Sequence, residues 1–150
     1  MKENFNERRI TNQVCEYWKE IKKDRTYPKK SDIDFEEIVE LLPYCVIIKI
    51  TPTNKEVKYE YDHLGDMVDK FYNEGVFAET FVQFVSPEIE NFEEYLEEVY
   101  DSGEPIIEHS HTTIDINQNS VKFRQCILPL SDNGKEINAV LCAINCKRYS

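Results

Sequence analysis

Two strand-like stretches carry the polar side chains that this sequence offers for binding a small molecule. Tyr59, Tyr61 and His63 alternate with charged residues, so they share one strand face and could line a cavity or simply pack against a sheet. Arg124 and Gln125 are embedded in a second strand and point to opposite faces. The one that points inward needs a ligand, a carboxylate or a backbone carbonyl as its partner, because burying an unpaired polar group is costly.

Catalytic and metal-binding chemistry has little support in the sequence. The GxSxG, HExxH, P-loop and dinucleotide-binding motifs are absent. The only candidates for acid–base chemistry are His63 and Asp62. Asp62 could also pair with a buried polar side chain of the second stretch. His109 and His111 share a strand face and could reach one metal ion, but further ligands are not evident. We therefore predict no catalytic residues and no metal site.

A loop near the amino terminus holds a second group of polar residues. Trp18, Arg25, Pro28 and Asp32 could form a functional loop. A simpler interpretation is that Arg25 pairs with Asp32 or Asp34 and fixes the loop in place.

Composition limits the class of protein and of partner. The chain has 150 residues, of which 41% are hydrophobic, so one core is expected. A net charge of −11 argues against nucleic acid, since affinity for phosphate comes largely from Lys and Arg. No apolar run is long enough to span a membrane and no signal peptide is present, which predicts a cytoplasmic protein without membrane partners. Cys45, Cys126 and Cys142 lie in apolar runs, as structural thiols do.

The residues from Phe5 to Lys23 are predicted to form an amphipathic helix. Its apolar residues recur at spacings of three and four, which gives one stripe along the helix. The stripe consists of Ile10, Val14, Tyr17, Trp18 and Ile21. It must cover either its own domain or a second copy of the chain, and we predict that it is the interface of a homodimer. A short helical turn is expected from Asp34 to Leu42, with Pro43 ending it.

The remaining elements predict a sheet interrupted by a helical crossover. Strands are expected at residues 44–50, 56–62, 105–116, 121–130 and 137–144. Helical pieces are expected at 63–72 and 77–84, followed by a helix that begins at Ser86 and Pro87 and ends at Gly103. Asn117–Asn119 and Ser131–Gly134 are predicted turns, the latter a tight hairpin.

This order of elements, with several local motifs, resembles that of a PAS-like domain. The amino-terminal motifs are Tyr17-Trp18, Arg25, Pro28, Asp32-Ile33-Asp34 and Leu41-Leu42-Pro43, and the closing motifs are Phe123-Arg124, Pro129-Leu130 and Asp132 to Gly134. They are similar to those of one bacterial PAS group of largely uncharacterised proteins. Gly65 resembles the glycine that opens the crossover, but Asp66 replaces the small hydroxyl residue that usually follows it.

The resemblance implies an α+β fold, in which a five-stranded antiparallel sheet with a helical crossover follows an amino-terminal amphipathic helix. We expect an amino-terminal helix and connector at residues 1–31 and the PAS-like domain at 32–150. The implied function is a stand-alone sensory or signalling module that binds a small molecule or a partner protein. A small isomerase or thioesterase, or a structural interaction protein with a filled core, are the alternatives. The cofactor is unknown, and haem, flavin and metal have no support.

Overall fold

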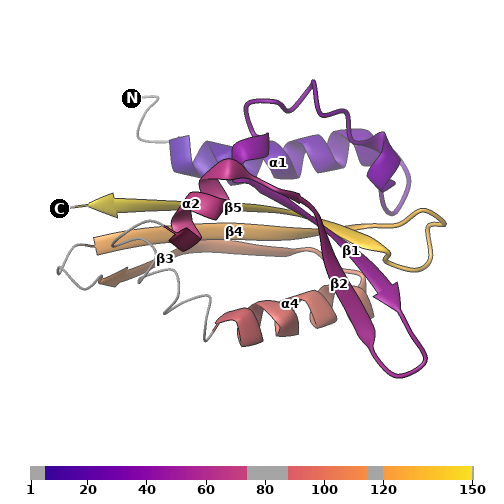
Figure 1. Cartoon of the computed structure of the whole chain (residues 1–150). Coiled ribbons are helices and arrows are strands. Elements are labelled where there is room, and N and C mark those ends of the chain that lie inside the picture. Colours follow the sequence, from indigo (N-terminus) through magenta and orange to yellow (C-terminus); the bar gives the residue numbers. More distant parts are fainter. Residues whose placement is uncertain (1–5, 74–87, 115–119, 150) are drawn as a thin grey trace.

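The computed structural model describes residues 6–73, 88–114 and 120–149 (Figure 1). Its elements are α1 (Asn6–Lys22), η2 (Lys30–Asp32), η3 (Leu42–Tyr44), β1 (Cys45–Pro52), β2 (Val57–Leu64), α2 (Asp66–Asn73), α4 (Glu88–Ser102), β3 (Ile106–Ile114), β4 (Ser120–Leu130) and β5 (Ala139–Tyr149). The helical piece predicted at 77–84, the helix start at Ser86 and Pro87, and the turn at Asn117–Asn119 lie outside the described residues.

The five strands form one antiparallel sheet in the order β2-β1-β5-β4-β3. The predicted five-stranded antiparallel sheet is therefore confirmed. Strand β5 pairs with β1 on one side and with β4 on the other, and its residues 139–145 are all buried. A nearly continuous apolar sequence suits such a strand, because both of its faces are covered.

The two faces of the sheet carry separate hydrophobic clusters, with α1 on one face and α4 on the other (Figure 1). We call the face under α1 the outer face and the face under α4 the inner face. The inner cluster contains Val46, Ile48, Ile50, Val68, Leu96, Val99, Ile127, Ile137, Val140, Cys142 and Ile144. The outer cluster contains Val14, Cys15, Tyr17, Trp18, Ile33, Ile38, Cys45, Ile47, Cys126, Leu128, Leu130, Ala139, Leu141 and Ala143.

Helix α1 packs on β4 and β5 with the apolar stripe that its sequence predicts. The indole Nε1 of Trp18 donates a hydrogen bond of 2.8 Å to the carbonyl of Pro129. Pro129 pairs with Val140 of β5. On the other side of β4 it has no partner among the described strands, because Ile127 is the last β4 residue that pairs with β3. The helix ends at Lys22, and Lys23 has a positive φ of 58°.

The short helical turn predicted from Asp34 to Leu42 is present as successive turns at residues 35–41, although Val39 faces solvent. Two other local predictions need correction. His63 lies in strand β2, and the helix predicted from there begins only at Asp66. The β4–β5 connection is a longer loop, 131–138, instead of a tight hairpin.

Side-chain hydrogen bonds explain why the β4–β5 loop is longer than a tight turn. The Oδ1 of Asn133 accepts hydrogen bonds from the N–H groups of Lys135 and Glu136. The Oγ of Ser131 accepts one from Gly134, whose φ is +79°. These side chains accept hydrogen bonds from backbone N–H groups of the loop. In a two-residue turn such groups would instead be paired between the two strands.

The end of α4 agrees with the sequence. Gly103 has a φ of +71° and its N–H donates to the carbonyl of Val99, as a left-handed helix cap does. Within the described residues, no helix combines the length and apolarity that a membrane crossing requires.

Candidate functional site

The predicted ligand-binding residues are distributed over both faces of the sheet. Tyr59 and Tyr61 pair with Ile50 and Ile48, whose side chains belong to the inner cluster. Gln125 also points to the inner face, because it alternates with Cys126 of the outer cluster. Tyr59 packs against the inner cluster, whereas Tyr61 is 60% exposed. These three residues therefore share the inner face.

The inner-face residues do not form one compact site. Tyr59 pairs with Ile50, whose N–H donates to the carbonyl of Asn138 at the start of β5. Gln125 pairs with Ile144, six positions further along β5. Six strand residues span roughly 20 Å. Tyr59 and Gln125 thus lie near opposite ends of the inner face.

A β-bulge moves His63 away from the two tyrosines. The register shifts between Ile47 and Ile48, which pair with His63 and Tyr61, so Asp62 is an extra residue in β2. An extra residue reverses the alternation of side chains beyond it. His63 consequently pairs with Ile47 of the outer cluster, and the predicted common face of Tyr59, Tyr61 and His63 is wrong for His63.

On the outer side, His63 and Asp62 contact the connector that follows α1. The Nε2 of His63 lies 2.9 Å from the carbonyl of Leu42, and its ring centroid lies 5.8 Å from that of Phe35. Because a carbonyl only accepts, His63 donates this hydrogen bond. Asp62 forms an ion pair with Lys30. Neither residue faces the inner side of the sheet, where the enzyme alternative would need its acid or base.

Arg124 and Gln125 occupy opposite faces, as predicted. Gln125 is the inward residue and is 2% exposed, and its side chain interacts within the protein. Arg124 is half-buried on the outer face, at the position that pairs with Asn145. Asp62, the carboxylate considered as a partner for the inward residue, binds Lys30.

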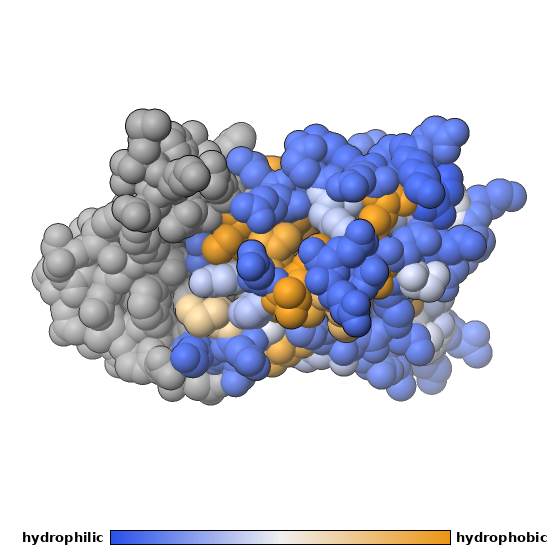
Figure 2. Space-filling view, turned by 90° about the horizontal axis from the view of Figure 1, so that it is seen from above, coloured by the Kyte–Doolittle hydropathy of each residue, from blue (hydrophilic) through white to orange (hydrophobic). Residues whose placement is uncertain are grey.

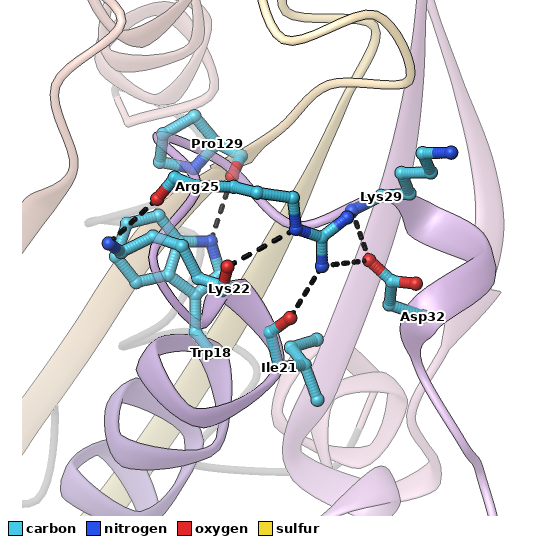
Figure 3. Close-up of polar contacts among 7 residues, drawn as sticks. All are labelled: Trp18, Ile21, Lys22, Arg25, Lys29, Asp32 and Pro129. Atoms are coloured by element: carbon cyan, nitrogen blue, oxygen red, sulfur yellow. Dashed lines mark hydrogen bonds and ion pairs between the residues drawn. The ribbon is translucent and has the colours of Figure 1, made fainter.

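The loop after α1 is fixed by Arg25, as Figure 3 shows. Its Nη2 donates to Asp32 Oδ2 at 2.7 Å and to the carbonyl of Ile21, while its Nε donates to the carbonyl of Lys22. The predicted pairing of Arg25 with Asp32 is confirmed. Arg25 also satisfies carbonyls at the end of α1 that have no partner within the helix. The N–H of Lys29 and the Arg25 guanidinium together lower the pKa of Asp32.

Two further contacts join this connector to the rest of the fold. The hydroxyl of Tyr17 accepts a hydrogen bond from the N–H of Asp34 and donates one to Glu37, and burial raises the pKa of Tyr17. The N–H of Ser131 donates to the carbonyl of Pro28. The cluster therefore has a structural role, connecting α1, the connector and the β4–β5 loop.

The residues predicted as a dimer interface lie mostly within their own protomer. Val14, Tyr17 and Trp18 are buried against the outer face, and Ile10 and Ile21 are half-buried. Of the two surfaces that the stripe could cover, α1 covers its own sheet. Its role in a dimer stays a prediction.

Four cysteines, Cys15, Cys45, Cys126 and Cys142, are free and buried. Burial raises the pKa of Cys45 to about 12 and that of Cys142 still further. A hydrogen bond between Cys15 and Cys126 lowers the pKa of the Cys15 thiol and raises that of Cys126. These thiols fill the core as small apolar groups, as their sequence setting predicts for Cys45, Cys126 and Cys142.

The histidine pair is described by its backbone alone. His109 and His111 lie in β3, where the register shifts between Glu108 and His111, and their side chains lie outside the described residues. Among the described residues, no group of three or more His, Cys, Asp or Glu side chains could hold a metal ion.

Sequence reasoning missed an open groove of about 430 Å³ on the outer side of β1 and β2. Lys30, Ile33, Phe35, Ile47 and Asp62 line it. The signal that could have located it is the position of Phe35 among the acidic residues of the segment 34–40, since this aromatic side chain is 47% exposed.

A comparison with protein families matches residues 7–145 to the model of the PAS domain. Neither the curated proteins nor the solved structures compared with this chain include a match. The family match covers α1 from its second residue, the strands β1 to β4, and β5 as far as residue 145. The chain therefore belongs to the PAS domain family.

Proposed function

We propose that this chain is a sensory and signalling module, which binds a small molecule at the inner face of the sheet and reports its state to a partner protein. The observation that carries the proposal is Gln125, a polar side chain that is 2% exposed on an otherwise apolar face. An amide offers two donors and an acceptor, and a few polar groups of this kind fix the orientation of a ligand in a mainly apolar site.

Native mass spectrometry of the freshly purified protein tests this proposal. We expect an extra mass that is lost on denaturation. It should be lost from Gln125→Leu but retained in Tyr59→Phe, the control at the opposite end of the face. A bare wild-type chain, or an unchanged extra mass in Gln125→Leu, would refute the small-molecule proposal and favour an interaction protein with a filled core.

The module is proposed to be non-enzymatic and cytoplasmic. His63 and Asp62 are engaged with the connector on the outer face, so the acid–base pair of the enzyme alternative does not line the inner face. Free cysteines in the described core suit a reducing compartment. The division into an amino-terminal helix and connector at residues 1–31 and a PAS-like domain at 32–150 is likewise part of the proposal.

The homodimer is retained in a modified form. Val14 and Trp18 would have to leave their own sheet to meet a second copy, so we assign the contact to the half-buried margins of the stripe at Ile10 and Ile21. Sedimentation of Ile21→Lys should give a monomer, whereas Glu20→Lys on the exposed face of α1 should behave as wild type. A wild-type protein that sediments as a monomer would refute the homodimer proposal.

A further inference from the structure

The connector between η2 and η3 exposes two large apolar side chains, and the first of them, Phe35, lines the groove. Phe35 is 47% exposed and Val39 is 61% exposed, although Ile33 and Ile38 of the same segment are buried in the outer cluster. Seen from above in Figure 2, hydrophobic side chains gather in the middle of this side of the molecule, with hydrophilic ones between and beside them. Single exposed apolar residues are common, so the argument depends on what surrounds these two.

The groove beside Phe35 has an apolar wall and a charged rim. Ile33 and Ile47 are almost fully buried parts of the outer cluster that form its wall, and the Lys30–Asp62 ion pair lies at its edge. The bulge in β2 brings Asp62 to this position. The groove is open to solvent and has a volume of about 430 Å³, so a side chain on the surface of a partner can reach it.

The connector segment of this surface carries charge of one sign, whereas Lys30 at the edge of the groove is paired with Asp62. Between Asp34 and Glu40 the sequence DFEEIVE contains four carboxylates and no Lys or Arg, and these carboxylates are exposed. Two of them already have partners, because Asp34 caps the N–H of Glu36 and Glu37 accepts a hydrogen bond from Tyr17. The whole chain carries a net charge of −11. Such a surface attracts cationic partners and orients them before contact.

We propose that this surface, formed by Phe35, Val39, the groove and the carboxylates of residues 34–40, docks a basic amphipathic segment of a partner protein. An apolar side chain of that segment enters the groove against Phe35, and its Lys or Arg residues pair with Glu36 and Glu40. A docking surface is useful only to a module that reports to a partner, so this assignment rests on the function proposed above.

The test uses two labelled synthetic peptides and the full chain. One peptide is a helix with leucine on one face and lysine on the other, and the second replaces every leucine by serine. Fluorescence anisotropy should show tight binding of the first peptide alone. The Phe35→Ser, Val39→Ser double variant should weaken it about tenfold or more, as the loss of central apolar contacts does. Both side chains are largely exposed, so the variant should retain the Trp18 fluorescence of the folded protein.

Charge variants separate this surface from general attraction to an acidic protein. Glu36→Gln, Glu40→Gln should weaken binding and flatten its salt dependence. Glu94→Gln, Glu97→Gln on the exposed side of α4 is the matched control, where the charge change is equal and the side chains between them are not exposed. This control should bind the peptide as wild type does.

Several results would overturn the proposal. Equal binding of both peptides, no loss in the Phe35→Ser, Val39→Ser variant, or an equal loss in the α4 control would each do so. A wild-type dimer in sedimentation that becomes monomeric in the apolar double variant would assign the surface to a second copy instead. A wild-type protein that carries no extra mass but still binds the peptide would refute the small-molecule proposal alone. A wild-type protein that carries the extra mass but does not bind the peptide would refute the docking surface alone.

Discussion

Replacing Gly65 by alanine should destabilise the fold through a backbone clash. Gly65 is buried between β2 and α2, and its N–H donates to the carbonyl of Cys45. A Cβ at this position would lie 2.2 Å from the carbonyl oxygen of Pro43 and 2.5 Å from that of Leu42. Both contacts are with backbone atoms of η3, which cannot rotate away as the end of a side chain can.

The magnitude follows from what must move. Overpacking costs about 1–3 kcal/mol when side chains can adjust, so a clash with two backbone carbonyls should reach at least about 3 kcal/mol. Gly134→Ala provides the comparison, because φ at Gly134 is +79° and its Cβ would meet nothing within 4 Å. Left-handed strain alone should cost about 1–2 kcal/mol there.

Urea denaturation measures both variants in parallel. Trp18 is the single tryptophan and is buried, so its fluorescence reports unfolding directly. We expect a clearly lower midpoint for Gly65→Ala than for Gly134→Ala. Equal midpoints, or a smaller loss for Gly65→Ala, would show that η3 gives way easily and would refute the reasoning.

Three further predictions concern single contacts. Trp18→Phe removes the hydrogen bond to Pro129 and should cost about 1–2 kcal/mol by circular dichroism in urea, and an unchanged midpoint would contradict this. Because the pKa of Asp32 is lowered in the folded state, its contribution to stability is present above its unfolded pKa and is lost as the pH falls through the lower folded value. The stability deficit of Asp32→Asn should therefore shrink on acidification, and a deficit that is constant with pH would remove the ionic explanation. Cys45 and Cys142 should resist iodoacetamide at pH about 8 in the folded protein and react in urea, as intact mass would show, since burial blocks access and raises both pKa values.

The strands were predictable because burial leaves a direct mark on the sequence. The apolar residues of β1 and β5 and the alternation in β2 locate three strands within a few residues of their observed bounds. The ion pair of Arg25 with Asp32 was also predictable, as one of two pairings, because Arg25 and the carboxylates of Asp32 and Asp34 lie on the same short connector. These features depend on residues that are close in sequence.

The bulge and the groove could not be predicted in the same way. Tyr59, Tyr61 and His63 alternate perfectly in the sequence, and the extra residue becomes visible only when β2 is paired with β1. Phe35 and Val39 have helical spacing, but the segment is fixed in turns by contacts with Tyr17 on another element. In both cases distant contacts decide which face a side chain occupies.

The strand order also has a consequence for how the protein is made. The central strand of the sheet is β5, the last of the described strands, and it pairs with β1, the first of them. During synthesis on the ribosome, β1 and β2 emerge early, but one edge of β1 stays unpaired until β5 has been translated. The apolar side of α1 also stays uncovered until β5 has been translated, because it packs on β4 and β5. This domain can therefore finish folding only after β5 has been translated, and until then the nascent chain presents both a free strand edge and an uncovered helix that chaperones can bind.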